Sequence, residues 1–222
     1  MNQTQVPASN GQDESPINLT ALRNRLPRWI GRFIPSGGGQ HGDRHGKKMF
    51  GVTIFLLSES MVFVSFFASY ITLRLTTSNW LPDGVSGPEA SFPVVLNTVI
   101  LVSSSFVIFF AERALERDRI TQFRVLWLLT TAMGTYFLFG ELQEWQGLDF
   151  GLTSGIAGGT FYILTGFHGL HVTVGIILQL VMLARSFFLQ QEEGHFGVSA
   201  VSLFWHFVDV IWLVLFSLIY LW

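Results

Sequence analysis

Residues Thr160–Gly175 read TFYILTGFHGLHVTVG. The segment is apolar enough to lie in hydrocarbon, yet it carries His168 and His171. In a helix, a spacing of three residues places both imidazoles on nearly the same face, one turn apart. A polar ring at membrane depth is costly unless another part of the protein receives it. We therefore expect partners for these histidines on neighbouring helices, and the nature of those partners bears on function.

The composition of the whole chain is that of a membrane protein. Of its 222 residues, 50% are hydrophobic and only 13% are charged, whereas soluble domains carry about 25% charged residues. Each of five apolar runs is close to or above the ~20 residues that a spanning helix needs. We predict an all-α integral membrane protein, a bundle of five transmembrane helices, from the runs Met49–Leu73, Phe92–Ala111, Phe123–Trp145, Gly155–Ala184 and Ser199–Trp222.

The distribution of basic residues predicts the orientation of these helices. With five spans the two termini lie on opposite sides of the membrane. Twelve of the thirteen Lys and Arg residues then lie on the side of the N-terminus, and Arg74 alone lies on the other. By the positive-inside rule, the N-terminus is expected in the cytoplasm and Trp222 outside.

The chain is expected to divide into a tail, residues 1–48, and a five-helix membrane domain, residues 49–222. Within the cytoplasmic tail, Leu19–Ile34 has apolar residues at helical spacing with four arginines between them. This pattern predicts a basic amphipathic helix lying on the membrane surface, and a basic disordered tail is the alternative. The start of the chain shows no signal-peptide pattern. No cysteine is present, which excludes disulfides and thiolate metal sites.

Ionisable residues also occur in the middle of other predicted spans. At ~1.5 Å per residue, Glu59 lies about 14 Å into the first span, Asp209 about 15 Å into the last, and His171 about 20 Å into the fourth. Because satisfying one another is the least costly way to keep such groups in the membrane, we expect an intramembrane polar network. A structural network, a proton relay and a metal or haem site all remain open on spacing alone. The expected members are Glu59, His168, His171, His206 and Asp209.

A second group of polar residues closes the third span. Glu141, Gln143 and Glu144 are expected near the outer face of the membrane. They are able to form a cation site, but such residues more often form hydrogen bonds with neighbouring helices or meet a partner subunit. We expect outer-side polar contacts from Gln143 and Glu144.

Several motifs together resemble subunit III of haem–copper terminal oxidases. The last two spans contain TGFHGLHVTVG followed, after a short loop, by GHFGVSAVSLFWHFVDVIWLVLFSLIYLW. Three further motifs follow the same order in the family: FLLSES around Glu59, FPVVLNT at the start of the second span and GELQEW at the end of the third. The resemblance runs from about Lys48 to Trp222 and is to the five-helix bacterial form.

The resemblance implies a non-catalytic subunit of a complex that reduces oxygen to water and pumps protons. Haem and copper are then expected in subunits I and II, with no metal held by this chain. Subunit III is expected to pack against subunit I, to hold phospholipid in a cleft between helices and to assist proton uptake and stability during turnover. The resemblance further implies a multi-pass protein of a bacterial plasma membrane or another energy-transducing membrane, without a nucleic-acid partner.

The resemblance also implies roles for individual residues. Glu59 matches the family's intramembrane glutamate, and His168, His171, His206 and Asp209 match polar positions of the last two helices. Arg185 and His195 match cytoplasmic-side residues that meet lipid headgroups.

The electron donor and the rival functions remain to be distinguished. His195-Phe196-Gly197 resembles the cytochrome c oxidase branch of the family. Subunit III of a quinol oxidase is the alternative. The rivals from other classes are a free-standing haem-binding protein and a proton-coupled carrier, although internal repeats and broken helices of the carrier type are not visible.

Overall fold

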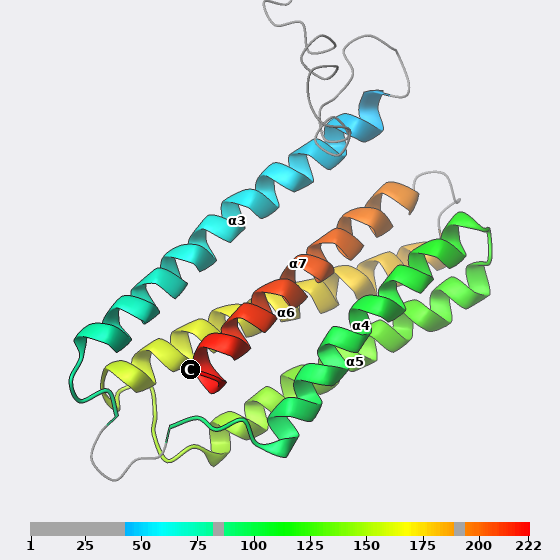
Figure 1. Ribbon diagram of the computed structural model, residues 1–222. Coiled ribbons are helices and arrows are strands. Elements are labelled where there is room, and N and C mark those ends of the chain that lie inside the picture. Colours follow the sequence, from blue (N-terminus) through cyan, green and yellow to red (C-terminus); the bar gives the residue numbers. More distant parts are fainter. Residues whose placement is uncertain (1–42, 82–86, 189–193) are drawn as a thin grey trace, which may run out of the picture. The chain divides into compact units, whose positions relative to one another are not determined.

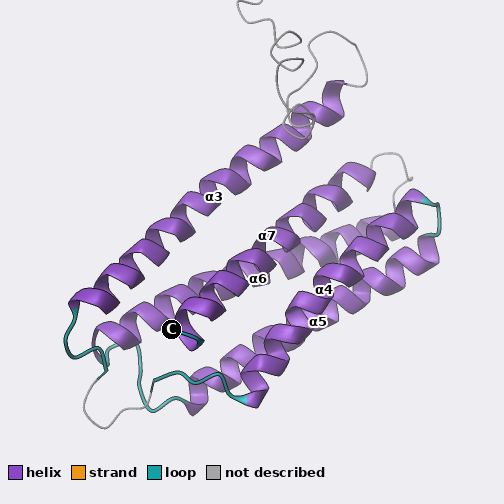
Figure 2. Cartoon of the chain, in the orientation of Figure 1, coloured by secondary structure: helices purple, strands orange, loops and turns teal. Residues whose placement is uncertain are grey.

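The computed structural model describes residues 43–81, 87–188 and 194–222, and the side chains of residues 49–81, 87–187 and 196–222. The described residues form five α-helices, and all five are long and apolar enough to cross a membrane (Figures 1 and 2). The predicted all-α class with five spanning helices is confirmed. The helices are α3 (Asp43–Thr76), α4 (Phe92–Glu116), α5 (Ile120–Gly147), α6 (Gly155–Phe188) and α7 (Gly194–Tyr220).

Several helices extend past the apolar runs that predicted them. Helix α4 continues from Ala111 to Glu116, and α3 begins at Asp43 rather than at Met49. A prediction from hydropathy stops at the first charges, but Glu, Lys and Arg are good helix formers and carry the helix out of the apolar layer. The start of α4 was predicted correctly, and Pro93 lies in its first turn, where the missing N–H is tolerated.

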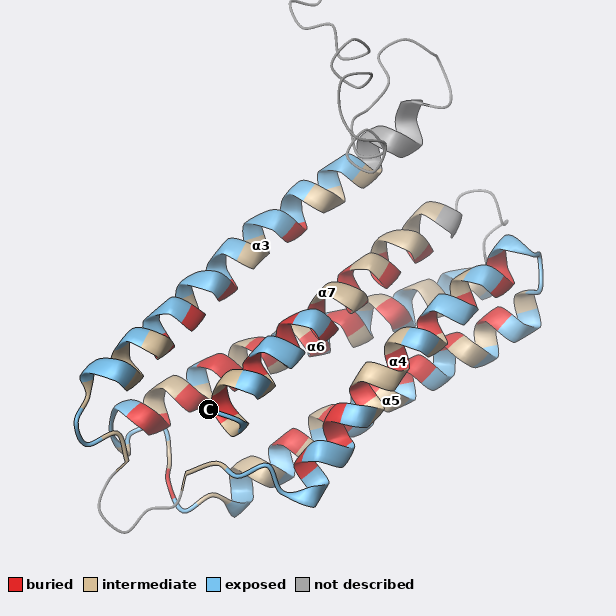
Figure 3. Ribbon diagram, in the orientation of Figure 1, coloured by how far each residue is buried: buried red, intermediate tan, exposed pale blue. Residues whose placement is uncertain are grey.

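Four of the helices form a closed ring within the compact unit that comprises residues 52–222. Helix α4 contacts α5 and α7, and α6 contacts the same two helices from the other side (Figure 1). The buried residues lie on the facing sides of these helices (Figure 3). The largest fully buried side chains include Trp127, Trp205, Trp212, Phe123, Phe137, Leu101 and Ile108.

Trp205 of α7 is the side chain that joins all four helices of the ring. Its indole is fully buried and its Nε1 donates to Ser104 Oγ of α4 at 2.8 Å. A Cβ atom at Gly134 of α5 would lie 2.5 Å from the indole, and one at Gly175 of α6 would lie 2.8 Å from it. Both distances are too short for any side chain, so these two glycines allow α5 and α6 to close on the ring of Trp205.

Helix α3 lies outside this ring and reaches it through long side chains. The ring of Phe63 lies 5.5 Å from that of Phe167 on α6 and 6.3 Å from that of Phe207 on α7. Most other apolar side chains of α3 are exposed, and the smallest buried share of the five spans belongs to this helix. The segment Leu19–Ile34, predicted to be amphipathic, lies outside the described residues.

Candidate functional site

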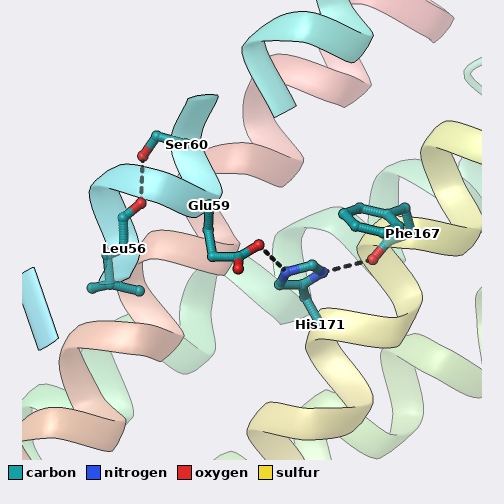
Figure 4. A network of polar contacts seen from close by, with 5 residues as sticks. All are labelled: Leu56, Glu59, Ser60, Phe167 and His171. Atoms are coloured by element: carbon teal, nitrogen blue, oxygen red, sulfur yellow. Dashed lines mark hydrogen bonds and ion pairs between the residues drawn. The ribbon is translucent and has the colours of Figure 1, made fainter. Parts of the chain in front are cut away.

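One pair of ionisable side chains connects α3 to α6. Nε2 of His171 lies 3.2 Å from Oε2 of Glu59, and Nδ1 of the same ring lies 2.8 Å from the carbonyl oxygen of Phe167 (Figure 4). Because a carbonyl only accepts, Nδ1 carries a hydrogen. A single proton then lies between Nε2 and the carboxylate, on one atom or the other. Both side chains are more than three quarters buried, so this shared proton is partly shielded from water.

A second polar cluster lies between α4 and α7. Ser105 Oγ donates to Asp209 Oδ2 and lies 3.0 Å from Nδ1 of His206. A hydroxyl has one hydrogen to donate, so Nδ1 of His206 donates to Ser105. Asp209 is buried, and its other oxygen, Oδ1, has no hydrogen-bond partner among the described residues.

This cluster belongs to a longer row of polar contacts, which we call the α4–α7 seam. From Thr98 to Glu112 along α4, the partner residues on α7 follow one another in the opposite direction. This order is expected for antiparallel helices in a fixed register. Three of its hydrogen bonds involve a buried Trp indole or a buried carboxyl group. The seam comprises the pairs Thr98–Trp212, Ser104–Trp205, Ser105–His206, Ser105–Asp209 and Glu112–Ser199.

His168 belongs to neither of these two groups. Its ring is fully buried, 4.8 Å from the ring of Trp212 and 5.8 Å from that of Phe137. Within the described part of the chain, neither ring nitrogen of His168 has a hydrogen-bond partner. The i, i+3 spacing of the two histidines therefore places them in different surroundings, because three residues of helix rotate a side chain by roughly 60° short of a full turn.

The other predicted site residues lie near the ends of the helices. Glu144 accepts a hydrogen bond of 2.7 Å from the Tyr220 hydroxyl, whereas Gln143 lines a cavity. Glu141 is buried, and neither of its carboxyl oxygens has a partner in the described structure. Arg185 is exposed in the last turn of α6, and His195 lies outside the residues whose side chains are described.

The five residues expected to form one network are thus divided into a Glu59–His171 pair, a His206–Asp209 cluster and an isolated His168. Depth alone could not separate them, because each group faces a different neighbour. The hydrogen bonds of Ser104 and Ser105 were not predicted, because small polar residues within a span usually indicate only close packing of helices. In residues 49–81, 87–187 and 196–222, no three His, Asp or Glu side chains gather closely enough to hold a metal ion.

The family model and the similar proteins all indicate the same family. The family model described as Cytochrome c oxidase subunit III matches residues 29–222. A cytochrome c oxidase subunit 3 of Synechocystis is 40% identical over 213 residues, which cover 93% of this chain and 88% of the relative. One from Thermostichus vulcanus is 40% identical over 78% of this chain and 87% of its own. One from Papio hamadryas is 36% identical, with 78% and 69% covered.

Proposed function

The chain belongs to the cytochrome c oxidase subunit III family, and we propose that it is the non-catalytic third subunit of a terminal oxidase that reduces oxygen to water and pumps protons. Membership makes it a multi-pass integral membrane protein and a subunit of a haem–copper oxidase complex. The proposal adds that its own contribution is structural, in support of the subunits that carry the redox centres.

The observation that carries the proposal is that the family match spans all five helices. The contacts that the polar groups make between helices support the proposal of a structural role. Glu59 and His171 join α3 to α6, and Ser105 joins α4 to two groups of α7. These groups bind one another across helix boundaries, so each is a contact between helices in a setting where bare polar groups are costly.

Haem and copper are proposed to reside in subunits I and II, and cytochrome c is proposed as the electron donor to the complex. The names of the relatives support the choice of donor over a quinol. The proposal also includes a cytoplasmic N-terminus, supported by the distribution of basic residues, and assistance to proton uptake in the companion subunits.

Phospholipid is proposed as the ligand of this chain. The exposed guanidinium of Arg185 lies at the end of a spanning helix, where it can meet a lipid phosphate with directed hydrogen-bond donors. The exposed apolar face of α3 offers hydrocarbon tails a surface to cover.

The test is purification of the tagged chain in a mild detergent, followed by identification of co-eluting proteins and an optical spectrum. We expect subunits I and II at equal stoichiometry and haem bands that follow them. The haem should stay with the companions when this chain is dissociated from them. Haem retained by this chain alone, or purification without companions, would refute the proposal. Oxygen consumption with reduced cytochrome c or with a quinol then identifies the donor.

A further inference from the structure

One ring nitrogen of His206 stays unpaired when the α4–α7 seam is formed. Nδ1 donates to Ser105, so Nε2 carries the free lone pair of the neutral ring and can only accept a hydrogen bond. Among the described residues, Nε2 has no donor to accept from. The ring is partly exposed, and Nε2 is not one of the unpaired atoms that are shielded from the surface. His206 therefore presents an unsatisfied acceptor to whatever covers α7.

This acceptor lies deep in the membrane. At ~1.5 Å per residue, His206 is about 15 Å from the start of the apolar span Phe196–Tyr220 and about 21 Å from its end. Phospholipid headgroups remain at the two surfaces of the bilayer, and hydrocarbon tails have no donor. A polar group without a partner is costly at this depth. The molecule that covers His206 is therefore expected to bring a hydrogen-bond donor into the hydrocarbon layer.

The exposed side of α7 continues from His206 as an apolar surface. Val210, Leu213 and Val214 are 41–58% exposed and follow His206 at helical spacing, so they lie on the same face (Figure 3). We call these four residues the α7 stripe. Lipid tails would suit its three apolar members, but not His206. The composition of the stripe thus matches the side of a second membrane helix better than it matches lipid.

We propose that the α7 stripe is a docking face for a transmembrane helix of a companion subunit, and that this helix presents a hydroxyl, amide or indole donor to Nε2 of His206. The inference rests on the proposed function, because it requires the companion. Helices associate in membranes through close packing and through hydrogen bonds between side chains. The α7 stripe offers an apolar surface for packing, and its single directional acceptor fixes the register of the incoming helix.

A second copy of this chain fits the α7 stripe less well than a companion does. Two copies packed on the same stripe about a two-fold axis along the membrane normal would bring residues of equal depth together. Nε2 of His206 would then face Nε2 of the other copy, and two acceptors cannot form a hydrogen bond. A companion with a different sequence is free to place a donor at this depth.

The first test is a photo-cross-link in the assembled complex. A photoreactive amino acid replaces Val210, which is 58% exposed and lies one turn from His206. The control carries it at Ile163, which is 51% exposed on α6, outside the stripe. We expect irradiation to join Val210, and not Ile163, to a companion span that contains Ser, Thr, Tyr, Asn, Gln or Trp. Cross-links only to lipid, to a second copy or to this chain's own residues would overturn the inference.

The second test separates the two nitrogens of His206. Asn places its amide nitrogen close to the position of Nδ1, so His206→Asn keeps a donor for Ser105 and removes the acceptor at Nε2. Gln reaches the position of Nε2 but loses the bond to Ser105. We expect His206→Asn to raise the dissociation constant of this chain from the complex roughly threefold to twentyfold, the range for hydrogen bonds between membrane helices. Dilution of the complex in a mild detergent measures it.

His206→Gln is the matched control for the seam. It should bind the companion nearly as tightly as the native chain, although hydrogen exchange along the seam should become faster. Equal binding by the native chain and His206→Asn would overturn the inference. Weaker binding by His206→Gln than by His206→Asn would overturn it as well, because the bond to Ser105 would then be the one that matters.

The two tests also separate this inference from the proposed function. A chain that co-purifies with oxidase subunits, but shows neither the cross-link at Val210 nor the effect of His206→Asn, refutes the contact at the α7 stripe alone. A chain that never co-purifies with them refutes both.

Discussion

Helix α3 and the α4–α7 seam are two helix contacts that use the same kinds of polar group in different ways. At α3, the Glu59–His171 pair is accompanied by aromatic contacts, and most of the helix is exposed. At the seam, the polar contacts lie among buried Trp rings and continue along most of the two helices. The pair holds one point of a loosely attached helix, whereas the seam is part of a close-packed core.

From this difference we expect packing, rather than the hydrogen bond itself, to set the strength of each of these two helix contacts. Interhelical hydrogen bonds in membranes average about 0.6 kcal/mol and reach about 1.7 kcal/mol. A Trp enclosed by glycines of two neighbouring helices contributes more, because its loss leaves a cavity. The seam should therefore be hard to open, and α3 should be the first of the five helices to separate.

Trp205→Ala should have the largest effect, since it empties the position where four helices meet. We expect a loss of about 3–5 kcal/mol in the free energy of unfolding, the cost of a large buried aromatic. Thermal denaturation of the purified complex, followed by release of this chain, measures it. Phe106→Ala on the exposed face of α4 is the control. An effect of Trp205→Ala no larger than the control would show that the ring is not closed around this indole.

Ser105→Ala should be the next largest, because it leaves a buried carboxyl of Asp209 without its remaining donor. The expected loss is about 1–2 kcal/mol, at the upper end for such bonds. Ser65→Ala is a matched control, since Ser65 is exposed and donates only to Met61 of its own helix. Equal denaturation temperatures for the two variants would mean that the seam is held by apolar packing alone.

The fold could be predicted from the sequence because it depends on quantities that a sequence carries directly. Five apolar runs of spanning length predict five helices, whichever way they later pack. The errors lie at the ends, as for α4 at Glu116, where the helix outlasts its apolar run. The ring of four helices with α3 outside it could not be predicted, because it depends on which faces meet.

The polar groups show the same limit at the level of residues. The depths estimated from the sequence placed Glu59 and His171 at levels where they can meet, and the two side chains are in contact. An estimated depth does not give the direction in which a side chain leaves its helix, so the separate environments of His168 and Asp209 were not predicted. Gly134 and Gly175 are the sequence features that indicate the close packing around Trp205, since small residues mark close helix contacts. Only the three-dimensional arrangement shows which side chain they accommodate.

Glu59→Ala should have a smaller effect on stability than either change in the core. We expect about 0.6 kcal/mol, the average for a hydrogen bond between membrane helices, and faster hydrogen exchange confined to α3. Glu59→Gln keeps a group able to bond to Nε2 of His171 and should restore most of the protection. The haem bands of the complex should not change in either variant. Loss of those bands in a complex that is still assembled would contradict a structural role for Glu59.

Arg185→Ala should have the smallest effect on unfolding, because the side chain is exposed. The proposed lipid contact predicts a different readout, the loss of a tightly bound phospholipid in native mass spectrometry of the complex. Arg185→Lys keeps the charge but not the paired donors of the guanidinium, so part of the lipid should remain. Arg117→Ala, exposed between α4 and α5, controls for lost charge. Unchanged lipid stoichiometry in Arg185→Ala would leave α3 as the region that lipid covers, through its apolar face alone.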